Sequence, residues 1–354
     1  MIWLTWRQFR GAAATMSAVL LVLAAALVLT GPELASDYST GIAACTQSGD
    51  CTRFFDRFFD DYEAPFLIVT VIVLVLPGLV GLFWGAPLIT RELEAGTHLL
   101  VWNQSITRTR WLAVKLALIG LAAMAAACLC SLAVTWWSGP LDRSAAPGFA
   151  LMDPLVFGAR GVAPMGYAAF AFVLGVTVGM LVRRTLPAMA VTLALFAAVQ
   201  IAMPLTVRPH LLPPVVSTFE VGPANVDSLM LPRNGSPRML LESAIPGHAG
   251  AWVLSSHLLD PSGRPTDADA LGAVVPVSVT SGPCSPGAQA QAAQSGGPVD
   301  GCIAEINRLG YRQQATYQPF DRFWPFQWIE TGIYALLTLG VSGFCFWWIR
   351  RRLS

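Results

Sequence analysis

The residues best placed for chemistry form a short polar stretch, residues 91–115, between two long apolar runs. It reads RELEAGTHLLVWNQSITRTRWLAVK. Glu92 and Glu94 are carboxylates that could pair with arginine or lysine of another protein. Glu92 and Gly96 are four residues apart, on one face of a helix, and Gly96–Thr97 is suited to end or bend that helix. We therefore expect one or two short helices that contact a partner. The alternative is a basic loop that only orients the chain.

Catalysis and ion coupling find little support elsewhere in the sequence. No phosphate-binding loop of the form GxxxxGK[ST] is present. The histidines lie in loops, away from any candidate serine or cysteine nucleophile and without the spacing of metal ligands. Ion-coupled transporters use ionisable groups inside the membrane. Here the interiors of the apolar runs contain no paired ionisable residue, since Lys115 and Glu330 lie near their edges, and Gln200 is the most polar group well inside a run. We expect no catalytic, cofactor or metal site, and any energy must come from a partner.

The composition is that of a polytopic membrane protein. Apolar residues make up 55% of the 354 residues and charged residues 12%, against about 25% charged in soluble proteins. A run of about 20 apolar residues suffices to cross a bilayer. Six runs meet this requirement: 12–30, 66–86, 112–135, 164–182, 186–205 and 327–349. The 22 basic residues comprise 21 arginines and one lysine, which is typical of GC-rich, and particularly actinobacterial, genomes.

The sequence predicts an all-α membrane protein with a further domain between spans five and six. Residues 1–11 have the pattern of an amphipathic helix on the membrane surface. Residues 12–206 contain spans one to five, with a cytoplasmic loop at 87–111. Residues 207–326 are rich in Pro, Gly, Ser and Ala and are expected to fold as an extracellular domain of mixed α/β or irregular structure, with a strand at 271–280. Residues 327–354 form span six and a basic tail.

Charge sets the orientation of the spans. With the N-terminus inside, the inside segments contain 11 basic and two acidic residues, a net charge of +9, and the outside segments have a net charge of −8. Short cytoplasmic loops of membrane proteins are rich in Lys and Arg. We therefore place both termini in the cytoplasm of a bacterial cell, with residues 207–326 outside.

Four of the seven cysteines fall in segments that this orientation places outside. Cys45 and Cys51 are close in sequence, as are Cys284 and Cys302. Disulfides form in oxidising compartments, so we predict the pairs 45–51 and 284–302. Four free thiols, or pairs that join the two segments, are the alternatives.

Three further patterns have both a functional and a structural interpretation. Phe58 and Phe59 belong to an aromatic face beside acidic residues. With Gln200, this face could lie on the path of a substrate, or it could anchor and pack a helix on the outer leaflet. Two GxxxG pairs, Gly81–Gly85 and Gly175–Gly179, could form a dimer seam or pack helices within one chain. Pro77-Gly78 and Pro87 predict a kink or an end in span two.

The polar stretch resembles the first cytoplasmic loop of the ABC-2 type permeases, the membrane subunits of type-2 ABC exporters. The resemblance lies in Arg91-Glu92-x-x-x-Gly96-Thr97, a Leu-rich turn, Ser105-x-Thr107-Arg108, and Lys115 opening the next span. It implies a chain without catalysis of its own, coupled to two ATP-binding cassette subunits that hold ATP and Mg, and paired with a second copy or a similar permease. The coupling residues would be Arg91, Glu92, Glu94, Gly96, Thr97 and Arg108. Residues 99–106 lack the proline common in the family, and the domain at 207–326 is larger than in many members.

Together these patterns favour an exporter subunit that moves an amphipathic or hydrophobic molecule, such as an antibiotic, a lipid or a peptide, through the lipid membrane. A membrane-anchored sensor or envelope-assembly subunit, whose extracellular domain binds a ligand without transport, is the alternative. The lack of paired ionisable residues disfavours ion-coupled transport. We expect no nucleic-acid partner.

Overall fold

The computed structural model describes residues 2–48, 51–96, 107–144, 149–222, 225–232, 237–242, 245–248, 250–269, 272–292 and 300–351. The chain divides into two compact units. The first, here called the helical unit, comprises residues 1–144, 154–211 and 324–354. The second, the sheet unit, comprises residues 145–153 and 212–323. Residues 207–211, predicted to open the extracellular domain, instead belong to the helical unit, where residues 207–210 continue a helix.

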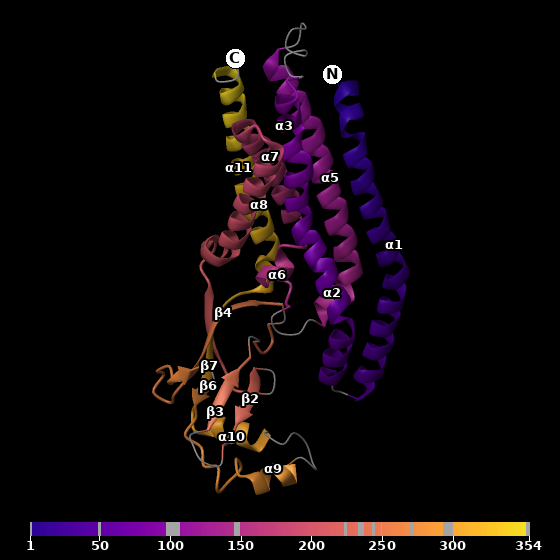
Figure 1. Ribbon diagram of the computed structural model, residues 1–354. Coiled ribbons are helices and arrows are strands. Elements are labelled where there is room, and N and C mark those ends of the chain that lie inside the picture. The colour runs from indigo at the N-terminus through magenta and orange to yellow at the C-terminus, as the bar shows by residue number, and fades with distance from the viewer. Residues whose placement is uncertain are drawn as a thin grey trace. The chain divides into compact units, whose positions relative to one another are not determined.

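The helical unit is built from long helices that run side by side (Figure 1). Long and short together, its described helices are, in chain order, α1 (Ile2–Ser48), α2 (Thr52–Val80), η1 (Gly81–Gly85), α3 (Ala86–Glu94), α5 (Arg108–Arg143), α6 (Pro154–Phe157), α7 (Ala163–Val182), α8 (Thr185–Ala202), η2 (Met203–Val207), η3 (Arg208–His210) and α11 (Phe323–Arg351). Helices satisfy every backbone polar group within the segment, which is what a bilayer demands.

The prediction of six membrane-spanning helices is confirmed. Within the described residues, six helical segments are long and apolar enough to cross a membrane. They are Phe9–Gln47, Phe54–Glu94, Arg108–Arg143, Ala163–Val182, Thr185–His210 and Phe320–Arg351. Each of the six contains the whole of its predicted apolar run, and the first three extend well beyond it. Apolar content therefore locates a span, while the helix itself continues wherever a neighbour packs against it.

The first two spans continue past their apolar runs as an antiparallel hairpin. The Tyr38 ring of α1 lies 5.5 Å from Phe58 of α2, and the Tyr62 hydroxyl donates to Asp37 over 2.7 Å. Cys45 is disulfide-bonded to Cys51 where the hairpin turns. The aromatic face around Phe58 therefore belongs to the first turns of α2, which pack on α1, and does not form a separate helix.

At its start, α1 is one uninterrupted helix. Residues 2–11 are its first turns, and the helix continues through Gly11 and the following alanines, which are strong helix formers. Within the described residues, α1 and the first span are therefore one helix. That residues 1–11 lie on the membrane surface stays a prediction.

The sheet unit contains two antiparallel sheets among its described residues. One has the order β1 (Val215–Phe219), β7 (Arg312–Gln318), β4 (Trp252–Leu259). The other has the order β2 (Val226–Met230), β3 (Arg238–Leu241), β6 (Gly272–Val274), β5 (Ala268–Asp269). Two short helices, α9 (Pro286–Ala292) and α10 (Asp300–Arg308), follow β6. The predicted strand at 271–280 is wrong beyond Val274, because Pro276 has no N–H to donate to a ladder; residue 271 lies outside the described residues.

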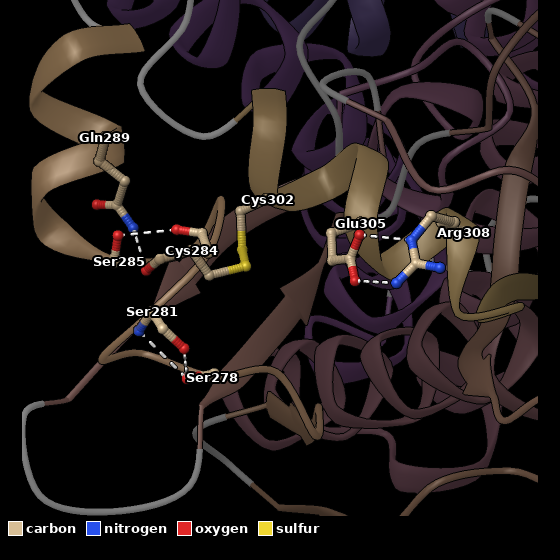
Figure 2. The surroundings of a disulfide bond; sticks show 9 residues. Ser278, Ser281, Cys284, Ser285, Gln289, Cys302, Glu305 and Arg308 are labelled. Carbon is tan, nitrogen blue, oxygen red and sulfur yellow. Dashed lines mark hydrogen bonds and ion pairs between the residues drawn. A yellow bond between two sulfur atoms is a disulfide. The ribbon is translucent and has the colours of Figure 1, made fainter.

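A disulfide lies in the core of the sheet unit, as predicted. Cys284 and Cys302 are bonded and almost fully buried, in one cluster with Met239 and Ile306. Figure 2 shows Gln289 of α9 donating to the Cys284 carbonyl over 3.1 Å. The bond thus ties α9 and α10 to the apolar face of the second sheet.

Removing this disulfide is expected to destabilise the sheet unit. A cross-link that closes a loop of this length contributes about 3 kcal/mol by restricting the unfolded chain. In the double variant Cys284→Ser and Cys302→Ser, protease should therefore begin to cleave the sheet unit at a lower temperature than in the wild type. Cys45→Ser with Cys51→Ser is the matched control, because that pair lies in the helical unit. Equal protease resistance of both variants would contradict the prediction.

Candidate functional site

The two GxxxG pairs meet each other inside this chain. A Cβ built on Gly85 would lie 2.5 Å from the Phe172 carbonyl oxygen and 3.1 Å from the Gly175 Cα atom. A Cβ on Gly179 would lie 2.7 Å from the Ala86 carbonyl oxygen. Only glycine allows two helix backbones to approach this closely. Both pairs thus form one seam between η1–α3 and α7, which we call the glycine seam.

Span two neither ends nor breaks at its prolines. Helix α2 passes through Pro77, and Pro87 occupies the first turn of α3, where its missing N–H is tolerated. Between them, residues 81–85 form a π-helical turn, η1. Such turns insert an extra residue into a helix and are frequent at functional sites. The predicted irregularity exists, but it is a π-turn at the glycine seam, and the helix continues to Glu94.

The carboxylates of the polar stretch are on this continuing helix and have partners within the chain. Glu92 accepts from the Lys115 ammonium over 2.5 Å, and that ammonium also lies 4.6 Å from the centre of the Trp111 ring. The Glu94 carboxylate accepts from both the backbone N–H and the hydroxyl of Thr185, over 2.8 and 2.7 Å. Glu94 thus caps the N-terminus of α8. Both glutamates thus join span two to spans three and five, and their predicted pairing with a partner protein stays a prediction.

The other predicted coupling residues are distributed around this end. Arg91 lies on α3 and is exposed. Gly96 follows the last turn of α3 with a φ of +66°, which glycine adopts without strain. Arg108 begins α5, where the Thr107 hydroxyl accepts from the Arg110 N–H over 3.4 Å. Thr97 lies outside the described residues.

An apolar groove of about 570 Å³ opens between α2 and α8. Gly78, Phe196, Gln200 and Leu205 are among its lining residues. Gln200 accepts a 2.5 Å hydrogen bond from the Tyr334 hydroxyl. The groove can accept an apolar molecule next to a single polar group. Phe58 and Phe59 are both buried and are not among its lining residues, so the groove does not bring the three predicted substrate-path residues together.

Residues 17–208 match the family model described as ABC-2 membrane transporter related. The match covers more than half of the chain. The chain belongs to this family. No curated protein and no solved structure matches it. The matched region of this ABC-2 related protein contains the glycine seam, Glu92, Glu94 and the groove. Membership makes the chain a component of a membrane transporter and implies partnership with an ATP-binding subunit.

This ABC-2 related protein also buries an ion pair that the sequence did not reveal. Arg208 donates two hydrogen bonds to the Glu330 carboxylate, over 2.8 and 2.9 Å, and the Tyr167 hydroxyl donates a third over 2.5 Å. The Arg208 and Glu330 side chains are 3% and 0% exposed. Glu330 lies near the edge of the predicted run 327–349 and Arg208 just beyond the predicted run 186–205, so this pair at the span ends does not contradict the prediction made for the span interiors. The partners are 122 residues apart. In the sequence, the pair could have been predicted only from an arginine and a glutamate that lie at the edges of separate apolar runs.

A second buried arginine lies between α6 and α7. The Arg160 guanidinium is 3.5 Å from the Asp142 carboxylate and 5.1 Å from the centre of the Phe66 ring. Burial lowers the pKa of Arg160, and the charge of Asp142 opposes that change. Nearby, the Gln327 side chain accepts from two backbone N–H groups, those of Val162 and Ala163. These contacts fix the start of α7 against α5 and α11.

Proposed function

We propose that this protein is the permease subunit of an ATP-driven exporter that moves an amphipathic or hydrophobic molecule out of the cell. The observation that carries the proposal is the groove between α2 and α8, whose lining is apolar apart from Gln200. Pockets of this size and composition are typical of sites for small apolar ligands. The chain performs no chemistry, and ATP and Mg bind to the partner subunit.

The helix formed by α2, η1 and α3 provides a mechanical link for this function. Gly78 on α2 lines the groove, while Glu92 and Glu94 end the same helix on α3. A force on α3 would therefore be transmitted along one helix to the wall of the groove. The ion pair with Lys115 and the cap on Thr185 would carry the same force to α5 and α8.

Residues 91–115 are the proposed contact for two ATP-binding cassette subunits, and a second copy of the chain or a similar permease would complete the transporter. The positive-inside rule places this stretch and both termini in the cytoplasm, and residues 207–326 outside. The contacts of Glu92 and Glu94 change the proposed role of these residues. In this proposal the two glutamates hold three spans together next to the contact with the ATP-binding subunits, and they do not bind those subunits themselves.

A charge swap tests this arrangement. The tagged chain is purified from its native membrane, and ATP hydrolysis by co-purifying protein is measured. Glu92→Lys should lower ATP hydrolysis roughly tenfold, because a buried cation then faces Lys115. Glu92→Lys combined with Lys115→Glu should restore most of it, because the pair is re-formed within the chain. Arg350→Glu, a charge reversal at an exposed residue outside residues 91–115, is the control for changes in net charge.

The outcomes of the swap separate the roles. If the double variant remains as impaired as Glu92→Lys, Glu92 acts on the partner and not through Lys115. If no ATP-hydrolysing protein co-purifies with the wild-type chain under mild extraction, the exporter proposal is wrong. The sensor or assembly function would then be the one to pursue.

A further inference from the structure

A small hollow lies beside the end of span two, away from the groove. Its volume is about 250 Å³, and its walls come from α1, η1 and α3. The lining residues are Phe9, Phe83, Trp84, Pro87, Leu88, Arg91 and Glu92. The hollow therefore combines an aromatic lining with two charged side chains, Arg91 and Glu92.

The hollow has a buried aromatic side, formed by Phe9 and Trp84, and an exposed aromatic side, formed by Phe83. The Phe9 ring packs edge-to-face on Trp84 with centroids 4.6 Å apart, and both are less than 10% exposed. Phe83, by contrast, is 55% exposed although it lies within the membrane-spanning segment Phe54–Glu94. A ring exposed on a spanning helix faces acyl chains, so the hollow is open toward lipid.

The charge of the hollow is positive. The Glu92 carboxylate is matched by the Lys115 ammonium. Arg91 is exposed, and among the described residues its guanidinium is attracted by the Glu94 carboxylate one turn along α3 without forming a hydrogen bond or ion pair with it or with any other residue. Arg7 and Arg10 are also exposed, on the turns of α1 that flank Phe9. An anion with an apolar tail complements both the charge and the opening toward lipid.

We propose that this hollow binds the headgroup phosphate of an anionic phospholipid, with Arg91 on the phosphate and the acyl chains along Phe83. Basic pockets between spanning helices are suited to such headgroups. A free phosphate would gain nothing from the aromatic wall, so the structure favours a lipid. Assignment to the cytoplasmic leaflet rests on the proposed orientation, but binding itself does not depend on transport. The lipid would hold the start of α1 against α3.

Native mass spectrometry of the purified full-length chain, without any ATPase, tests the proposal. The protein is titrated with phosphatidylglycerol or with phosphatidylcholine, and the affinity for the first bound lipid is compared. The wild type should prefer phosphatidylglycerol by about fivefold or more, the contribution expected of one arginine near an anionic headgroup. Arg91→Gln should reduce this preference to near one. Arg110→Gln, which removes an exposed charge from the start of α5, should leave it unchanged.

Two further measurements define the site. Phe83→Ser should weaken binding of both lipids, and glycerophosphoglycerol, which has the headgroup without acyl chains, should not displace bound phosphatidylglycerol. Equal losses in Arg91→Gln and Arg110→Gln would mean that only overall charge attracts the lipid, which would overturn the proposal. So would displacement by the soluble headgroup, or a wild type without preference. Because no ATPase is present, these outcomes are independent of the exporter proposal.

Discussion

Replacing Gly175 with alanine is expected to lower the free energy of unfolding of the helical unit by about 3 kcal/mol, the upper part of the range for overpacking. The added Cβ would lie 2.8 Å from the Ala86 backbone nitrogen and 3.1 Å from the Gly85 carbonyl carbon. It would also meet the Gly81 carbonyl oxygen. All three neighbours are backbone atoms, so no side chain can rotate away. The helices must separate, which also opens the contacts of α3.

The matched control is Gly340→Ala in α11. A Cβ there has nothing within 4 Å, so alanine should stabilise the helix by about 0.5–1 kcal/mol. The two substitutions are chemically identical and should have opposite signs in unfolding by SDS titration from mixed micelles. If Gly175→Ala left stability unchanged and weakened self-association instead, the glycine seam would be a dimer contact after all.

The features predicted correctly from the sequence are those set by short-range physics. A run of about 20 apolar residues has to satisfy its own backbone, so six runs gave six helices. Cysteines six and 18 residues apart were close enough to pair locally. The glycine pairs were recognised as sites of close approach, but the sequence left open whether the neighbour was another copy or α7.

The contacts that were missed depend on the packing order of the helices. Glu94 and Thr185 are 91 residues apart, and nothing in the sequence near either one specifies the other. Glu92 and Lys115 are only 23 residues apart, yet their pairing requires α3 and α5 to run antiparallel at one register. The π-turn at η1 shifts that register by a residue, and an apolar periodicity does not encode such a shift. As a result, residues that looked like a free cytoplasmic surface became internal contacts.

The second large effect is expected at the Arg208–Glu330 pair. Arg208→Met should lower the free energy of unfolding by about 3–5 kcal/mol, since removing one partner of a buried pair leaves a charge without compensation. Glu330 is fully buried, and the Tyr167 hydroxyl alone cannot replace the two guanidinium hydrogen bonds. The variant is compared with wild type by SDS titration, as for the glycine substitutions. Arg308→Met, which breaks an exposed pair with Glu305, should cost far less, because a solvent-exposed ion pair contributes little to stability.

Replacing both partners separates stability from function at this pair. Arg208→Met with Glu330→Met removes both charges, and apolar replacements of a buried pair are often neutral or stabilising. The double variant should therefore regain most of the stability lost in Arg208→Met. If the double variant is stable but transports poorly, the pair serves movement of α8 against α11 rather than folding. Arg208 lies near the end of the helical segment Thr185–His210, and Gln200 and Leu205 of the same segment line the groove. A double variant as unstable as Arg208→Met would mean that the geometry of the three hydrogen bonds, and not the charge of either partner alone, holds α8 to α11.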